Sequence, residues 1–216
     1  MDINSIDLTS NSPIWECLYF SESDQQKPLP RYRHEMCVYN NLLYILGGGT
    51  STTVFGFKTI PTFYLVEREW KYTKTEPDKF VIDFSNNRLD GFPDPRRCHS
   101  ALARDHMVYI IGGYDGNTIF DDIWRLDLLT LQWIKLRVIL PNPVYFHAST
   151  LTKDGQLIIF GGVDNIEENR RTDKVFSVWL EPPSLRAMCM EAVQHYIPNL
   201  STMSPDIIRE LGIPED

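Results

Sequence analysis

Short apolar runs, each followed by a glycine pair, dominate the pattern of hydrophobic and polar positions. The clearest run covers residues 107–111, precedes Gly112 and Gly113, and is followed by further apolar stretches that close at Trp133. Such runs have the length of β-strands, are rich in β-branched and aromatic residues, and are bounded by turn residues. Two glycines after a buried strand permit positive φ and the close approach of a neighbouring segment. Residues 95–136 are therefore expected to form one antiparallel sheet of four short strands.

The same pattern occurs twice more along the chain. Residues 42–46 and residues 157–160 are apolar runs that also end at glycine pairs, and a histidine precedes each run, at His34, His99 and His147. The spacing is close to the ~50-residue kelch repeat, with one insertion. The chain therefore resembles the kelch-repeat family, whose repeats form the four-stranded blades of a β-propeller.

The resemblance implies an all-β fold, a partial kelch β-propeller of about three four-stranded blades with a short C-terminal α-helical tail. The expected domains are an N-terminal segment with a Trp-containing blade strand (residues 1–28), a kelch region (residues 29–181) and the helical tail (residues 182–216). Within the kelch region the three repeats are placed at residues 29–74, 95–136 and 143–180.

The two ends of the repeat array are incomplete in complementary ways. Trp15 looks like part of the closing strand of a repeat whose beginning is missing, and the third repeat reaches no closing Trp strand after Trp179. The Trp15 strand could therefore pair beside the Phe176 strand and close a ring. Because three sheets cannot readily encircle an axis, we expect an open arc instead. Such an arc would be the C-terminal half of a larger propeller: a truncated gene product, a splice form, a paralogue that lost its first half, or a half that dimerises.

Composition narrows the class of partner. A net charge of −8 disfavours nucleic-acid binding, which needs a basic surface. The apolar runs are too short for a membrane span, and a secretory signal is not visible in the sequence. The cysteines are scattered and form no Cys-x-x-Cys pair; they are Cys17, Cys37, Cys98 and Cys189. This usage predicts reduced thiols in a cytoplasmic or nuclear protein.

No pattern in the chain favours catalysis, a cofactor or a metal. The three repeat histidines occupy equivalent places in three different sheets, so we interpret them as structural residues that hydrogen-bond the adjacent turn. The glycine pairs lack the Lys and Ser/Thr of a phosphate-binding loop, and no nucleophile with its base or paired acid is visible. The sequence thus predicts a non-catalytic binding subunit without cofactor.

The residues just before each repeat histidine are the best candidates for ligand binding. They precede an inner strand, in a turn that opens on one mouth of a propeller channel. Arginine pairs bidentately with carboxylates, and the neighbouring aromatic residues provide apolar walls. The alternative is that arginine at this place only pairs with a neighbouring blade. The candidate residues are Arg31, Tyr32, Arg33, Arg96, Arg97, Tyr145 and Phe146.

The tail changes from strand to helical periodicity after Pro182 and Pro183, with Ser184 as the expected N-cap. One helical face is expected to carry Leu185, Met188, Cys189, Ala192, Val193 and Tyr196. Leu185, Cys189 and Ala192, followed by Ile197 and Pro198, resemble an elongin-binding BC box with a cullin-2 box behind it. In such boxes the Leu and Cys enter a groove on elongin C. The alternative is a helix packed under the propeller.

Longer segments between about residues 29 and 212 resemble kelch proteins that serve as substrate receptors of cullin-2 RING ubiquitin ligases. The resemblance implies that the propeller binds substrates through C-terminal, glycine-ending degrons, and that the tail binds elongin B/C and cullin-2. The family's earlier repeats, and with them part of the channel wall, are absent here. The other functions considered are a non-catalytic interaction scaffold, a phosphatase- or kinase-binding regulator, and a truncated paralogue without this activity.

Overall fold

The computed structural model describes residues 2–21, 27–80 and 90–213. Parts of the expected N-terminal segment (22–26), of the loop before the second repeat (81–89) and of the tail (214–216) lie outside the described residues. The chain divides into two compact units, Met1–Thr150 with Ile158–Phe176, and Leu151–Leu157 with Ser177–Asp216.

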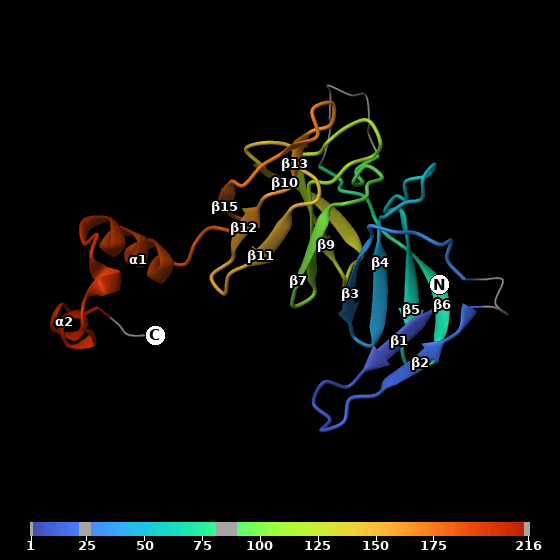
Figure 1. Ribbon diagram of the computed structural model, residues 1–216, viewed down its shortest axis with the longest axis horizontal. Helices are drawn as coiled ribbons and strands as arrows, with labels where there is room; N and C mark the ends of the chain where they lie inside the picture. The colour runs from blue at the N-terminus through green and yellow to red at the C-terminus, as the bar shows by residue number, and fades with distance from the viewer. Residues whose placement is uncertain (1, 22–26, 81–89, 214–216) are drawn as a thin grey trace. The chain divides into compact units, whose positions relative to one another are not determined.

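Two four-stranded antiparallel sheets form most of the first unit (Figure 1). In both sheets the strands follow chain order, so that each strand pairs with the next through a hairpin. The first sheet consists of β3 (Glu35–Tyr39), β4 (Leu42–Leu46), β5 (Thr59–Tyr64) and β6 (Glu69–Lys74). The second consists of β7 (Ser100–Arg104), β8 (Met107–Ile111), β9 (Asp122–Asp127) and β10 (Gln132–Ile139).

The apolar runs become the buried strands of these sheets because both of their faces are covered. Leu46 in β4 and Val108 and Ile110 in β8 are fully or almost fully buried. They belong to one core cluster that joins the two sheets and also includes Phe57 and the closing Trp133. The ring centroids of Phe57 and Trp133 lie 5.5 Å apart. The burial of these side chains is the main force that holds the first two sheets together.

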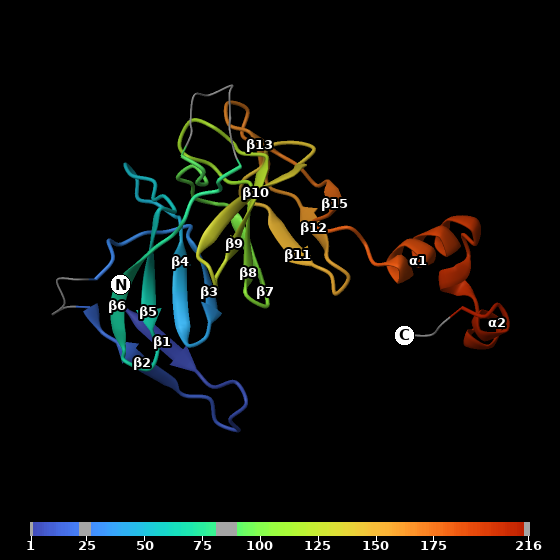
Figure 2. The same ribbon diagram turned by 180° about the vertical axis from the view of Figure 1, so that it is seen from behind.

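A two-stranded hairpin, β1 (Ile3–Ile6) and β2 (Trp15–Tyr19), lies against the first sheet in both views (Figures 1 and 2). The Tyr19 ring contacts Phe63 edge-on, with centroids 5.5 Å apart. Trp15 pairs with Ile6, so that β2 has β1 as its partner and is not a strand of the sheet that contains Phe176. A ring closed by the Trp15 strand beside the Phe176 strand is therefore not formed within the described residues, and the Trp15 strand does not stand alone, because β1 is its partner.

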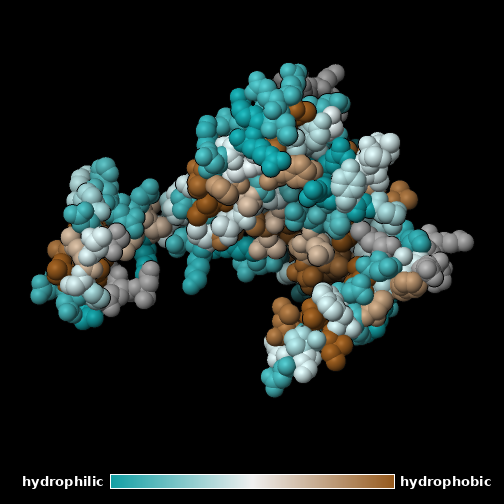
Figure 3. Space-filling view, viewed as in Figure 1, coloured by the Kyte–Doolittle hydropathy of each residue, from teal (hydrophilic) through white to brown (hydrophobic). Residues whose placement is uncertain are grey.

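Three large apolar side chains are exposed on this hairpin. Leu8, Ile14 and Trp15 are 80%, 78% and 67% exposed, and Figure 3 shows hydrophobic atoms beside hydrophilic ones on this part of the molecule. Only one face of the hairpin, which includes Leu18 and Tyr19, is packed against the first sheet.

The third sheet has three strands, β11 (Ala148–Leu151), β12 (Gln156–Phe160) and β15 (Val175–Trp179). A separate hairpin of β13 (Val163–Asn165) and β14 (Arg170–Arg171) is inserted between β12 and β15. Within the described residues the third sheet therefore lacks a fourth, closing strand, as the sequence of this repeat indicates. The all-β fold of antiparallel sheets with a short helical tail is confirmed, with sheets of four, four and three strands.

The tail forms α1 (Leu185–Tyr196), a 3₁₀ turn η2 (Leu200–Thr202) and α2 (Pro205–Glu210). Ser184 caps α1, since its hydroxyl accepts a hydrogen bond from the Ala187 backbone N–H (3.1 Å). Gly212, with φ +70°, follows α2 in the left-handed conformation that glycine adopts most readily. No helix among the described residues is long and apolar enough to cross a membrane.

Candidate functional site

The three repeats share a turn in which a non-glycine residue is left-handed. Arg33, Cys98 and Phe146 have φ of 56°, 57° and 59°. The turns are linked from repeat to repeat, because the Cys98 N–H donates to the Arg33 carbonyl (3.1 Å) and the Phe146 N–H donates to the Cys98 carbonyl (3.0 Å). Left-handed backbone costs about 1–2 kcal/mol for such residues, so the surrounding hydrogen bonds must hold it in place. The side chains at these turns are thus gathered at one end of the sheets.

The glycine pairs let these turns approach closely, as predicted. A Cβ on Gly47 (φ +58°) would lie 2.6 Å from the Arg96 carbonyl oxygen of the next repeat, and one on Gly112 (φ +56°) would lie 2.6 Å from the Val144 carbonyl oxygen. Both the backbone conformation and the lack of space therefore require glycine.

His99 and His147 are buried in the core, as expected of structural residues, but the predicted hydrogen bond to the adjacent turn is wrong for His99. Its buried ring nitrogens have no hydrogen-bond partner among the described residues, and its ring packs 5.9 Å from that of Phe57. His147 Nε2 instead shares a hydrogen bond with the Ser100 hydroxyl (2.8 Å). Burial lowers the pKa of His99 to about 3, with Arg96 adding to the effect, and burial lowers that of His147 to about 4. No group of three or more metal-binding side chains is present in the described part of the chain.

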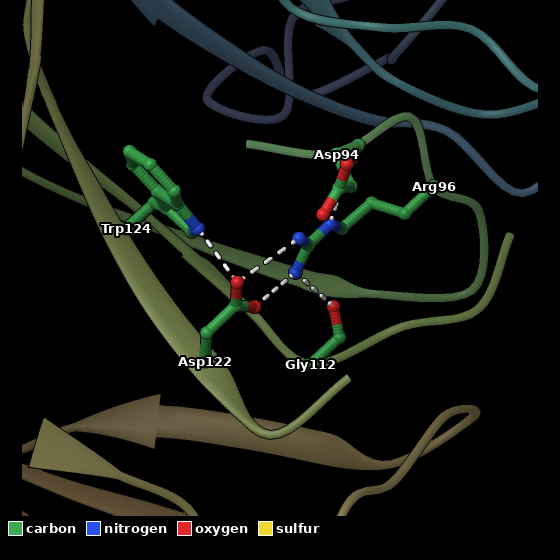
Figure 4. Close-up of polar contacts among 5 residues, drawn as sticks. All are labelled: Asp94, Arg96, Gly112, Asp122 and Trp124. Carbon is green, nitrogen blue, oxygen red and sulfur yellow. Dashed lines mark hydrogen bonds and ion pairs between the residues drawn. The ribbon is translucent and has the colours of Figure 1, made fainter. Parts of the chain in front are cut away.

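Arg96 is not available to a ligand, which corrects one of the predicted binding residues. Its side chain is fully buried, and its guanidinium forms a bidentate ion pair with Asp122 (Figure 4). The same group donates to the carbonyl oxygens of Asp94 and Gly112 (both 3.0 Å). Burial raises the pKa of Asp122, but the charge and hydrogen bonds of Arg96 and a hydrogen bond from Trp124 lower it further, and the net pKa is below its usual value. Arg96 therefore stabilises its own sheet.

Five of the other predicted residues do come together, with one residue, Tyr114, that the sequence pattern did not indicate. The Arg97 guanidinium donates to the Tyr32 hydroxyl (3.0 Å) and to the Thr50 carbonyl (2.6 Å). The Tyr145 ring stacks on that of Tyr114, with centroids 5.1 Å apart, and also contacts Phe146. We call Tyr32, Arg33, Arg97, Tyr114, Tyr145 and Phe146 the arginine–aromatic cluster.

Arg33 is the cation of this cluster with the most open donors. Its guanidinium carbon lies 4.6 Å from the centroid of the exposed Phe146 ring, and its side chain makes no hydrogen bond or ion pair within the described residues. Tyr114 was missed because it follows the glycine pair rather than preceding the histidine. The repeat pattern could have indicated it, because Tyr114 pairs with Arg97 in the same way that Gly49 pairs with Tyr32 and Val163 pairs with Tyr145.

Arg31 lies apart from this cluster. Its Nη1 donates to the Gly47 carbonyl (3.1 Å), and its guanidinium carbon is 3.8 Å from the centroid of the Phe55 ring. It lines a cavity of about 610 Å³ whose walls contain no member of the arginine–aromatic cluster.

In the second unit, α1 presents an exposed apolar stripe. Leu185, Met188 and Tyr196 are 76%, 52% and 82% exposed, and Cys189 and Ala192 are exposed between them. Val193, expected on the same face, is half-buried, as are Ala187, Met190 and Ile197, while Pro198 is exposed. The residues that resemble an elongin box are thus accessible on the surface of the helix, except for the partly covered Ile197.

The chain belongs to the kelch-repeat family. Residues 2–182 match the family model of the KLHDC2/KLHL20/DRC7 Kelch-repeats domain. Among individual proteins, the chain is similar to Kelch domain-containing protein 10 of Rattus norvegicus, with 38% identity over 215 residues that cover all of this chain and 50% of the relative. The Homo sapiens protein of the same name is 38% identical over 99% of this chain and 46% of its own length. The Kelch domain-containing protein 10 homolog of Drosophila melanogaster is 35% identical over 99% of this chain and 36% of its own.

The chain therefore spans about half the length of the curated relatives that it matches. Kelch-repeat proteins are generally binding proteins without catalytic activity. The antiparallel sheets described above correspond to the blades of that family.

Proposed function

We propose that this chain is a non-catalytic substrate-recognition subunit of a cullin-2 RING ubiquitin ligase. Its kelch repeats would bind C-terminal, glycine-ending degrons, and its tail would bind elongin B/C and cullin-2. The observation that carries the proposal is the exposed apolar stripe of α1, in which Leu185 and Cys189 have the spacing of an elongin box. All four cysteines are free, which suits the reducing cytoplasm or nucleus where such ligases act.

The stripe has the properties of a helix that enters a groove. Its members Leu185, Cys189 and Ala192 recur at the spacing of one helical face, and α1 has no buried residue. An exposed leucine on a capped helix loses little on binding, because the helix is already formed and only the side chain must be ordered. The tail therefore offers a preformed ligand for an apolar groove such as that of elongin C.

We expect the double variant Leu185→Ala, Cys189→Ala to capture elongin B/C at least tenfold more weakly than the natural chain. Removing a buried Leu costs about 2–5 kcal/mol where the groove cannot collapse around the smaller residue. The measurement is a binding titration of purified elongin B/C against the full chain. Leu211→Ala, a loss of the same side chain at a half-exposed position after α2, is the matched control and should bind normally. Unchanged capture by the double variant would rule out the elongin box and favour a plain interaction scaffold.

The arginine–aromatic cluster supports the degron part of the proposal. A peptide C-terminus is one carboxylate on a flexible chain, so a receptor needs a fixed cation and close walls. Arg33 supplies open N–H donors, and the Phe146 ring below it limits where a carboxylate can lie. Arg97 is held in place by Tyr32 and Thr50, which leaves it preorganised as a second positive charge. A terminal glycine suits such a site because it adds no side chain next to the carboxylate.

We expect Arg33→Ala to weaken the binding of a glycine-ending peptide by about tenfold or more, since a charge-assisted hydrogen bond contributes about 1.5–3 kcal/mol. Amidation of the peptide carboxylate should weaken binding at least as much, because the arginines then face a neutral group. The measurement is a titration of the full chain with the peptide and its amidated twin. Arg137→Ala, an exposed arginine of β10, serves as the control for loss of charge alone. Equal affinity for the two peptides, or binding of neither, would exclude this degron site.

A further inference from the structure

Arg31 and Arg96 are the same residue in two successive repeats. Each comes directly before a residue that forms an isolated β-bridge. Tyr32 pairs with Gly49 in the first repeat, and Arg97 pairs with Tyr114 in the second. Each donates to the first carbonyl of the glycine pair, and each guanidinium lies 3.8–3.9 Å from a phenylalanine centroid. The two side chains therefore have equivalent surroundings up to this point.

In the second repeat a carboxylate pairs with the guanidinium of this arginine. Asp122, the first residue of β9, holds the Arg96 guanidinium in a bidentate ion pair. In the third repeat both partners are replaced together. Val144 stands in place of the arginine, and Lys174 stands in place of Asp122, since its carbonyl accepts the hydrogen bond of the first glycine N–H just as that of Asp122 does (both 3.1 Å). In the second and third repeats the arginine and the acid are therefore present together or absent together.

The first repeat keeps the arginine and lacks the acid. Tyr64 pairs with Leu42 as Asp127 pairs with Met107, and this register places Thr59 at the position of Asp122. The segment between Phe55 and Thr59 is also two residues longer than the one between Phe120 and Asp122. No carboxylate of the described residues forms an ion pair or hydrogen bond with Arg31.

A cavity lies where the missing carboxylate would be. It measures about 610 Å³, and both Arg31 and Thr59 line it. Its other walls are mainly apolar and aromatic, including Phe55, Phe57 and Pro61, with Tyr72 at one side. A cavity of this size and lining is typical of a site for a small organic ligand or a peptide end.

Four charged residues line the cavity: Arg31, Lys58, Asp90 and Asp94. Lys58 and Asp90 neutralise each other in an ion pair of 3.2 Å, and no ion pair joins Arg31 to either acid within the described residues. Burial lowers the pKa of Arg31, which reflects a guanidinium that is partly removed from water. A bound carboxylate would restore the partner that Asp122 provides in the second repeat.

We propose that the cavity beside Arg31 binds a carboxylate attached to a small apolar or aromatic body, with the carboxylate in the place that Asp122 takes against Arg96. The site is separate from the arginine–aromatic cluster and goes beyond the degron site proposed above. The same chemistry is offered by a free organic acid, by the C-terminus of a peptide and by an acidic side chain within a protein segment.

The first test is a calorimetric or NMR titration of the full chain with 3-phenylpropanoate and with 3-phenylpropanamide, which has the same shape without the charge. We expect the acid to bind about tenfold more tightly than the amide, because only the acid can form charge-assisted bonds with Arg31. Equal affinities, or no binding of either at about 10 mM, would overturn the proposal. Two peptides then distinguish the sources, one with a free C-terminal Phe and one that is amidated and carries an internal Glu beside Phe.

The second test supplies the missing acid from the chain itself. Thr59→Asp should pair with Arg31, weaken the binding of 3-phenylpropanoate about tenfold or more, and raise the melting temperature. Thr59→Asn, which has nearly the same shape but no charge, should keep binding within about threefold. Arg31→Gln should lose binding in the same way as Thr59→Asp, and it gives the answer if the aspartate variant does not fold. Unchanged binding in Thr59→Asp or Arg31→Gln would overturn the proposal. Arg33→Ala should leave this binding intact, so failure here is distinguishable from failure of the degron site.

Discussion

Asp122→Ala is expected to lower the free energy of unfolding of this protein by about 3–5 kcal/mol, because it leaves the Arg96 guanidinium buried without its counter-charge. Arg96 is fully buried, and its other partners are the carbonyl oxygens of Asp94 and Gly112, which are neutral. The change also removes the acceptor of the Trp124 indole N–H (2.8 Å). Urea denaturation of the full chain, followed by tryptophan fluorescence, measures the difference.

Two further variants separate charge from packing. Asp173→Ala removes an exposed carboxylate and should change the free energy of unfolding by less than about 0.5 kcal/mol. The double variant Arg96→Met, Asp122→Leu should be less destabilised than Asp122→Ala, because replacing both members of a buried pair leaves no unpaired charge. A loss below about 1 kcal/mol for Asp122→Ala would show that water or another acid takes over as the partner of Arg96.

The fold could be predicted from the sequence because each repeat carries the same local requirements. A glycine pair is needed where the next repeat lies within contact distance, as at Gly47 and Gly112, and a buried strand of β-branched residues must precede it. Such requirements are local, so they produce the same residue types at a fixed spacing in the sequence of each repeat. The closing Trp133 adds a large side chain that only the core can accommodate.

The binding residues were harder to predict because their role depends on partners elsewhere in the chain. Arg31 and Arg96 occupy the same position in the repeat pattern. Arg96 is neutralised by Asp122 inside its sheet, whereas Arg31 lines a cavity. The difference lies at the first residue of the third strand of each sheet, Asp122 in one case and Thr59 in the other. The residue at that position, and not the arginine, distinguishes the first repeat from the second.

Aromatic contacts across repeats were also beyond the sequence pattern. Tyr114 stacks on Tyr145 although the two residues belong to different repeats. The sequence predicts a structural role for His99, but only its position in the core shows that its ring packs on Phe57, with no hydrogen bond to the ring nitrogens among the described residues. Contacts between sheets depend on how the sheets face each other, and a one-dimensional pattern does not contain that information.

The buried histidines make the protein sensitive to mild acid. Burial lowers the pKa of His99 to about 3 and that of His147 to about 4, from an ordinary value of 6.5. The folded state therefore binds fewer protons than the unfolded state, and stability falls as the pH drops below 6.5 until it approaches the folded pKa values. Each of these two histidines contributes about 1.4 kcal/mol per pH unit in this window, so the pair should cost about 3 kcal/mol when the pH is lowered to about 5.5. His34, whose pKa is also lowered by burial, adds to this loss.

This loss is measured as the difference in the free energy of unfolding by urea between about pH 7.5 and about pH 5.5. The pKa of Asp122 lies below 3.8, so this carboxylate stays ionised over the whole range and does not contribute. His99→Leu should remove about 1.4 kcal/mol of this loss at little cost near neutral pH, since the ring nitrogens of His99 have no hydrogen-bond partner to lose within the described residues. His195→Leu, at an exposed position of α1, should leave the pH dependence unchanged. Equal pH dependence in His99→Leu and the natural chain would show that His99 gains access to water before the protein unfolds.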